Sequence, residues 1–316
     1  MMRLGFAALA LALASQIASP WPDTLSGAAR SGLAADGARP PAPADMEGRR
    51  KLAEMVQRDI GRRQAERYRV DVSAQTIGGV AVRVFTPACP ARADAILLNL
   101  HGGGFVVDSG SLTENIPIAG LTGLTVVAVL YRLAPEHRFP ASIDDATSVY
   151  RGMLANQAQR RIGLYGTSAG AIMAAELVAR LRAEGLPKPA ALGFFSGSAD
   201  LSRTGDTMAR FLNADAGKEV AKLYAGTRDP KDPAISPARA SLNGWPATLC
   251  LSSTRDYLLS ATADFCRALD EAHVDARLVV FDGLPHAFWS YIEAPESDAA
   301  FATMARFLRR HLETTR

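Results

Sequence analysis

The chain has few cysteines and no recognisable metal-ligand spacing, and both shortages exclude classes of protein. Its three cysteines, Cys89, Cys250 and Cys266, form no C-x-x-C pair, so a disulfide framework has no support. We expect Cys250 and Cys266, in a predicted strand and a predicted helix, to be small apolar core residues; the role of Cys89 stays open. The five histidines include no H-E-x-x-H or comparable spacing, so the sequence predicts no catalytic metal.

Net charge is also small. The 35 Lys and Arg residues nearly balance the 32 Asp and Glu residues, for a net charge of +3, and the basic residues are scattered along the chain. This distribution predicts no nucleic-acid partner. Of the 316 residues, 48% are hydrophobic and 21% charged, which favours a packed globular protein over a disordered one.

The N-terminus has the pattern of an export signal. Met1-Met2-Arg3 precedes an apolar run over 4–14 that is too short to span a bilayer comfortably, and small residues follow. We therefore predict a signal peptide over residues 1–19, a secreted or periplasmic protein and no stable membrane insertion. An uncleaved anchor and a misassigned start codon are the alternatives. Residues 20–45, rich in Ala, Gly, Pro and Ser, are predicted to be a linker.

From residue 46 onward the hydrophobic pattern predicts one α/β domain. Residues 46–67 have the periodicity of an amphipathic helix, and 68–72 and 80–85 alternate around Gly78-Gly79 as a hairpin does. Nearly continuous apolar runs, typical of strands buried on both faces, then alternate with helical stretches. The runs are 95–100, 124–130, 162–165, 190–195, 247–251 and 276–281, and the helical stretches are 143–157, 169–184, 262–273 and 299–311.

This alternation predicts a mostly parallel central sheet with helices on both faces. It is interrupted at about 200–245, where a helical piece is expected near 219–224. An insertion at the carboxyl edge of the strands would lie over an active site there, so we expect it to form a helical cap together with 46–67.

The sequence Gly166-Thr167-Ser168-Ala169-Gly170 follows a predicted strand and precedes a predicted helix. This G-x-S-x-G context is typical of a nucleophile elbow, a tight turn that exposes a serine hydroxyl at the sheet edge. A serine needs a base beside it to act as a nucleophile near neutral pH.

Candidate partners for Ser168 follow later strands. Asp256 and His286 come after the two last predicted strands, so the chain order is Ser, acid, His, as in α/β-hydrolases. We predict that His286 takes the Ser168 proton and that Asp256 orients the imidazole. Asp282 is the main rival to Asp256, since it lies nearer His286 in sequence.

The segment His101-Gly102-Gly103-Gly104-Phe105 directly follows a buried strand. Consecutive glycines expose backbone N–H groups, so we predict that those of Gly103, Gly104 and Ala169 form an oxyanion hole. A phosphate-binding loop is the competing interpretation, but the Lys and Ser/Thr of a P-loop are missing.

These motifs together resemble the hormone-sensitive-lipase-type esterases, in the branch with a G-T-S-A-G elbow. The resemblance covers about 52–312 and rests on His101–Gly104, Tyr131–Glu136, Phe139–Ala141, Gly166–Gly170 and Pro285-His286. It implies a cap-bearing α/β-hydrolase fold and the oxyanion hole named above, with Glu136 and His137 as supporting residues. Two positions depart from a common family pattern: Thr167 replaces an Asp, and Ser260 replaces a second acid four residues after Asp256.

The resemblance implies a serine carboxylesterase that needs no cofactor, and we expect small-molecule esters with short to medium acyl chains as substrates. A lactone hydrolase, an amidase and a carbohydrate deacetylase remain alternatives that use the same triad, and a non-enzymatic ligand-binding protein is an alternative of another class. Members of the family often self-associate, and the sequence does not decide whether this chain forms a homodimer.

Overall fold

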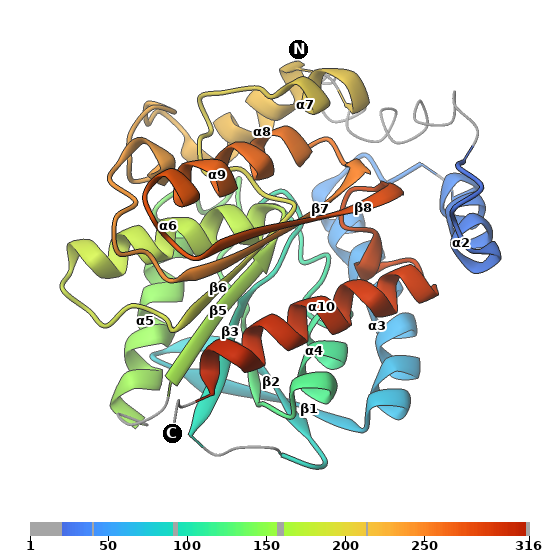
Figure 1. The fold of residues 1–316 in the computed structure, drawn as a ribbon, viewed down its shortest axis with the longest axis horizontal. Helices are drawn as coiled ribbons and strands as arrows, with labels where there is room; N and C mark the ends of the chain where they lie inside the picture. The colour runs from blue at the N-terminus through green and yellow to red at the C-terminus, as the bar shows by residue number, and fades with distance from the viewer. Residues whose placement is uncertain (1–20, 40, 91–93, 157–160, 213, 314–316) are drawn as a thin grey trace.

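A computed structural model of the chain describes residues 21–39, 41–90, 94–156, 161–212 and 214–313. The predicted signal peptide, residues 1–19, lies outside the described residues. Eight strands form one sheet in the order β1-β2-β4-β3-β5-β6-β7-β8 (Figure 1). The strands are β1 (Val70–Ile77), β2 (Val80–Pro87), β3 (Ala95–Leu100), β4 (Val126–Val129), β5 (Arg161–Thr167), β6 (Ala191–Phe195), β7 (Ala247–Arg255) and β8 (Ala276–Pro285).

The sheet is mostly parallel, as the sequence predicts. Strands β1 and β2 form the predicted hairpin around Gly78 and Gly79, and β2 also pairs antiparallel with β4. From β4 to β8 every neighbouring pair is parallel. All residues of β3, β4 and β6 are buried, which explains their unbroken apolar runs. The carboxyl ends of β5, β7 and β8 therefore lie at one edge of the sheet.

Helices cover both faces of this sheet. On one face, α5 (Ala141–Asn156), α6 (Ala169–Ala183) and α9 (Leu259–Glu271) contribute to one buried apolar cluster. On the other face, α4 (Asn115–Thr122) and α10 (Pro295–Leu312) contribute to a second cluster, with α3 (Met46–Tyr68) beside α4 (Figure 1). The α/β-hydrolase architecture with helices on both faces is confirmed. No described helix is long and apolar enough to cross a membrane.

The insertion after β6 contains α7 (Asp206–Phe211), α8 (Ala214–Ala225) and the short 3-10 helix η2 (Pro237–Arg239). Both α-helices of the insertion touch loops at the carboxyl edge of the sheet. The Thr207 hydroxyl in α7 donates to the Tyr257 carbonyl oxygen at 3.1 Å, and the ring of Tyr224 in α8 stacks on Phe105 with centroids 3.8 Å apart. The insertion therefore lies against the loops that follow β3 and β7.

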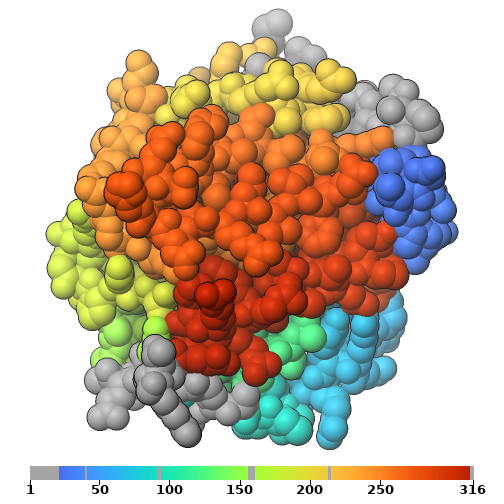
Figure 2. All heavy atoms as spheres, viewed as in Figure 1, coloured from blue at the N-terminus to red at the C-terminus, as the bar shows by residue number. Residues whose placement is uncertain are grey.

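Residues 20–45 differ from the expected linker, because 27–37 form a helix, α2 (Gly27–Gly37). Ser26 caps its N-terminus by accepting a hydrogen bond from the Ala29 N–H at 3.0 Å. Ala29 and Leu33 are buried in the cluster that contains α10. Figure 2 shows α2, in blue, beside the red C-terminal segments. Helix α2 buries only a narrow strip of side chains, and most of its residues are Ala, Gly and Ser. The sequence therefore shows no clear hydrophobic periodicity there, which is why the helix was not predicted.

Candidate active site

Ser168 lies in a strained turn between β5 and α6. Its backbone has φ 58° and ψ −123°, a conformation that a non-glycine residue rarely adopts and that is typical of functional turns. The flanking glycines are sterically required. A Cβ on Gly166 would lie 2.2 Å from the Gly170 carbonyl oxygen, and one on Gly170 would lie 1.9 Å from the Leu100 carbonyl oxygen. The segment thus has the geometry of a nucleophile elbow.

His286 and Asp256 are directly bonded to each other. The Nδ1 of His286 lies 2.7 Å from the Asp256 Oδ1, and this contact leaves the Nε2 edge of the ring free for another partner. Asp256 is fully buried and accepts further hydrogen bonds from Ser196, from Ser252 at 2.6 Å and from the Leu258 N–H at 2.8 Å. This arrangement fixes both the carboxylate and the imidazole.

The surroundings of Asp256 keep it ionised. Burial alone acts to raise the pKa of Asp256, but the nearby imidazole of His286 and the hydrogen bonds from His286, Ser196 and Ser252 outweigh it and hold that pKa below its usual value. Ser196 and Ser252 supply support where the family often has a second acid. Ser260, which occupies that position, instead binds α7, since its N–H donates to Thr207 at 3.0 Å.

The rival acid, Asp282, lies away from the imidazole. It is exposed and accepts hydrogen bonds from Thr24 at 3.1 Å and Thr254 at 3.2 Å. The structure therefore brings Asp256, and not Asp282, to His286.

Tyr257 contacts His286, and sequence reasoning missed it. Its ring stacks on the His286 imidazole with centroids 4.1 Å apart and an angle of 26° between the planes. Tyr257 thus packs against the loop after β8, while its backbone is bonded to α7. Only its position directly after Asp256 hinted at such a role.

The H-G-G-G loop lies against the elbow. A Cβ built on Gly102 would be 3.5 Å from the Ser168 Cβ. Gly103 has φ 122°, and a Cβ there would lie 1.9 Å from the Val107 carbonyl oxygen, so only glycine fits. Within the described part of the chain, no acceptor takes the N–H groups of Gly103, Gly104 and Ala169. These donors remain available for an anionic oxygen.

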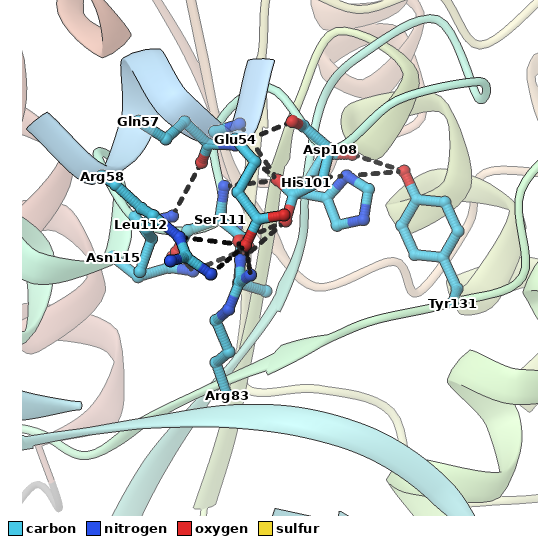
Figure 3. A network of polar contacts seen from close by, with 12 residues as sticks. Glu54, Gln57, Arg58, Arg83, His101, Asp108, Ser111, Leu112, Asn115 and Tyr131 are labelled. Atoms are coloured by element: carbon cyan, nitrogen blue, oxygen red, sulfur yellow. Dashed lines mark hydrogen bonds and ion pairs between the residues drawn. The ribbon is translucent and has the colours of Figure 1, made fainter. Parts of the chain in front are cut away.

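A network of polar contacts surrounds His101 and Asp108, which lie at the start of this loop and just after it (Figure 3). Tyr131 stacks on the His101 ring and donates to the His101 carbonyl oxygen at 2.7 Å. Asp108 accepts from Arg83 at 2.8 Å and from the Ser111 N–H at 2.9 Å, while Gln57 of α3 donates to the Asp108 carbonyl at 2.7 Å. The loop is thereby tied to β2, to α3 and to the segment that follows β4.

The network also sets the charge of Asp108. Burial acts to raise the pKa of Asp108, but the His101 imidazole, the hydrogen bonds from Ser111 and the charge of Arg83 hold it below its usual value. An ionised Asp108 accepts stronger hydrogen bonds than a neutral one, which rigidifies the loop that contains Gly103 and Gly104.

The Tyr131–Glu136 segment makes structural contacts. Arg132 is paired with Asp145 at 2.8 Å, and Glu136 is paired with Arg50 of α3 at 2.8 Å. Arg50 also donates to the Ala134 carbonyl oxygen at 3.1 Å. These contacts agree with the supporting role that the resemblance implies for Glu136. No group of three or more His, Cys, Asp or Glu side chains gathers as a metal site among the residues that the structure describes.

Residues 97–290 match the sequence model of a family described by its α/β-hydrolase fold. The chain belongs to this α/β-hydrolase family. An acetyl-hydrolase of Streptomyces hygroscopicus is 34% identical to it over 70% of this chain and 77% of the relative. An ethyl acetate hydrolase of Pseudomonas putida is 31% identical over 84% of this chain and 90% of the relative.

Solved structures agree with these relatives. A crystallised esterase superposes with a TM-score of 0.80 at 32% identity, covering 93% of this chain and 97% of its own. An esterase of the bacterial hormone-sensitive lipase family superposes with a TM-score of 0.77 at 27% identity, covering 96% and 97%. This α/β-hydrolase is therefore a carboxylic ester hydrolase of the hormone-sensitive-lipase type.

Proposed function

We propose that this ester hydrolase is a serine carboxylesterase that cleaves short- to medium-chain acyl esters through an acyl-enzyme on Ser168. His286 takes the Ser168 proton as the hydroxyl attacks the ester carbonyl and then protonates the departing alcohol. Asp256 holds the imidazole in the required tautomer and stabilises its charged form. Water activated by His286 then hydrolyses the acyl-enzyme.

The observation that carries this proposal is the 2.7 Å contact between His286 Nδ1 and Asp256 Oδ1. With Nδ1 occupied by an ionised, fully buried carboxylate, Nε2 is the ring atom left to exchange a proton with Ser168. The free N–H groups of Gly103, Gly104 and Ala169 support the second requirement, which is a set of donors for the oxyanion of the tetrahedral intermediate.

The names of the relatives favour substrates with small acyl groups. Two of them act as an acetyl-hydrolase and an ethyl acetate hydrolase, so we expect acetyl esters to be hydrolysed at least as fast as longer ones. Lactones and acetylated carbohydrates use the same chemistry and remain the alternative substrates.

Two measurements test the proposal. Ser168→Ala is expected to lower kcat by roughly 10⁴–10⁶-fold without loss of folding, and a fluorophosphonate is expected to label wild-type protein at Ser168 only. Activity within tenfold of wild type in Ser168→Ala would show that another group is the nucleophile. A panel of p-nitrophenyl esters graded by acyl length, run beside lactones and acetylated sugars, then ranks the substrate classes.

A further inference from the structure

Ser196 is a fully buried serine, directly after β6, whose backbone is left-handed. Its φ is 50°, and no part of its side chain is exposed. For a residue with a side chain this conformation is less stable than the right-handed one, whereas glycine adopts it freely. Residues held in such conformations cluster at active sites, and the contacts of Ser196 place it at this one.

The Ser196 hydroxyl binds the acid of the predicted triad. It donates a hydrogen bond to Asp256 Oδ2, and the Ser252 hydroxyl of β7 donates to the same oxygen at 2.6 Å. The other carboxylate oxygen, Oδ1, lies 2.7 Å from His286 Nδ1 and accepts from the Leu258 N–H at 2.8 Å. Ser196 therefore holds the carboxylate oxygen that does not contact the imidazole.

The same segment also binds the nucleophile elbow. The carbonyl oxygen of Phe195, the residue before Ser196, accepts a hydrogen bond from the Ser168 N–H at 2.9 Å. The Ser196 N–H donates to the Leu251 carbonyl oxygen of β7 at 2.8 Å. A single peptide unit, Phe195–Ser196, thus joins the backbone of the candidate nucleophile to the side chain of the candidate acid.

The next residue, Gly197, fixes this segment against two helices. A Cβ on Gly197 would lie 2.6 Å from the Ala171 Cβ of α6, so only glycine fits there. The Thr262 hydroxyl of α9 accepts from the Gly197 N–H and donates to the Gly197 carbonyl oxygen, both at 3.0 Å. Because the backbone is held in this way, a change confined to the side chain of Ser196 should leave the backbone contacts in place.

We propose that Ser196 is a positioning residue that holds the Asp256 carboxylate at a fixed place relative to Ser168. His286, bonded to that carboxylate, is thereby kept where it can take the Ser168 proton. The inference rests on the proposed function, because it takes Ser168 as the nucleophile and His286 as its base. Ser196 itself is buried and exchanges no proton with the substrate.

The hydroxyl also moderates the charge of the acid. Burial acts to raise the pKa of Asp256, whereas the charge and hydrogen bond of His286, and then the hydrogen bonds from Ser196 and Ser252, lower it. Without the Ser196 hydroxyl the carboxylate has a higher affinity for protons. For the same reason it stabilises a protonated imidazole more strongly.

Two tyrosines are the other titratable groups that the described contacts place against His286. The ring of Tyr257 stacks on the imidazole, and the Tyr291 hydroxyl donates to the His286 carbonyl oxygen at 3.3 Å. Burial is the largest effect on both phenols and raises their pKa above its usual value. Both therefore stay uncharged through the neutral range, and neither adds a titration to the triad there.

Two substitutions separate the hydroxyl of Ser196 from its backbone. Ser196→Ala removes the hydroxyl and keeps the left-handed strain, whereas Ser196→Gly removes the hydroxyl and relieves the strain. We expect kcat/KM for p-nitrophenyl acetate to fall roughly tenfold in both, the effect of losing one hydrogen bond to a charged group. The glycine variant is nevertheless expected to melt above the alanine variant by on the order of 2 °C.

The pH profile gives a readout that a loss of packing would not move. The acid limb of kcat/KM reports protonation of the base in the free enzyme. Because the carboxylate stabilises the protonated imidazole more strongly without Ser196, we expect this limb to move to higher pH by roughly half a unit in both variants.

Thr248→Val is the matched control for these variants. It removes another fully buried hydroxyl, at the opposite end of β7, that donates to the Pro246 carbonyl oxygen at 2.9 Å. We expect it to leave both kcat/KM and the acid limb as in wild type. A kcat/KM within twofold of wild type in Ser196→Gly, or an acid limb that does not move in either Ser196 variant, would overturn the inference.

Fluorophosphonate labelling keeps this inference distinct from the proposed function. In Ser196→Ala we expect stoichiometric labelling of Ser168 at a rate roughly tenfold below that of wild type. Labelling at the wild-type rate would overturn the inference about Ser196 and leave the nucleophile assignment intact. Labelling that persists in Ser168→Ala would overturn the nucleophile assignment, and with it the inference.

Discussion

Glu114 is a carboxyl group buried directly behind the nucleophile elbow. Its carboxyl faces the Thr167 hydroxyl and the Trp289 indole, although neither group makes a close hydrogen bond to it. Burial is the largest effect and raises the pKa of Glu114 to about 8. Thr167, the residue before Ser168, thus lies beside a carboxyl group that is protonated at neutral pH.

This shift makes stability depend on pH. In the unfolded chain Glu114 ionises near its ordinary pKa of 4.5 and in the folded protein near 8, so between these values unfolding releases a proton and the free energy of unfolding falls as pH rises. Glu114→Gln removes this dependence. We expect the free energy of unfolding of the variant, relative to that of wild type, to rise by several kcal/mol between pH 5 and 8. The slope is on the order of 1.4 kcal/mol per pH unit.

Urea unfolding of both proteins at pH 5 and pH 8 measures the difference. Glu271→Gln, at an exposed glutamate of α9, is the matched control and should follow wild type at both pH values. Parallel pH dependences for Glu114→Gln and wild type would mean that Glu114 ionises normally in the folded protein.

The sequence predicts residues whose role follows from a motif, and misses those whose role follows from packing. Ser168, Asp256 and His286 stand at strand ends, where chain order alone suggests a triad, and the structure places Asp256 against His286. Tyr257 and Glu114 carry no motif. Their importance comes from a stack on His286 and from burial behind Thr167, which depend on the packing of segments distant in sequence.

At the scale of elements, α8 is joined to the oxyanion loop through Tyr224. Its ring stacks on Phe105 at an angle of 8° between the planes, and Phe105 directly follows Gly104. The Tyr224 hydroxyl donates to the buried Glu176 of α6. Burial raises the pKa of both groups well above their usual values, which favours the uncharged form of each side chain.

The two contacts of Tyr224 predict different consequences. Tyr224→Phe retains the stack on Phe105 but leaves Glu176 without its donor, so we expect the free energy of unfolding to fall by about 1–3 kcal/mol with kcat/KM nearly unchanged. Tyr224→Leu also removes the stack, and kcat is expected to fall roughly tenfold because the oxyanion donors are less well held. Urea unfolding and ester kinetics of both variants check this. Equal losses of activity in the two variants would contradict the role of the stack.

Helices and strands with a clear hydrophobic periodicity could be predicted from the sequence. Elements whose formation depends on packing against distant segments could not. The helix at 46–67 and the central strands follow from periodicity and apolar runs. Helix α4 was missed because it contains Pro117 and Gly120. Gly120 is required for packing, since a Cβ there would lie 2.7 Å from the Tyr68 Cβ, so the residue that weakens the helical signal also allows α4 to approach α3.

At the scale of the whole molecule, the segment before α3 is part of the folded body. The Ser26 N–H and hydroxyl both donate to Glu296 of α10, at 2.6 and 2.8 Å. Leu25 and Leu33 are buried, and Arg255, the residue before Asp256, lies over the Trp21 ring at 4.6 Å. The chain ahead of the predicted domain thus covers the side of the molecule formed by β8 and α10.

Truncation tests whether this docking contributes to stability. A chain that lacks residues 1–19 keeps α2, whereas one that lacks 1–39 loses it and exposes the surface under Leu25 and Leu33. Each leucine contributes about 1.5–3 kcal/mol when buried, so the shorter chain is expected to melt lower by on the order of 5–10 °C. Leu33→Ala in the longer chain should show part of this loss. The triad is held by other contacts, so kcat/KM at 25 °C should stay close in all three proteins; equal Tm values would mean that 20–45 behaves as the linker its composition suggests.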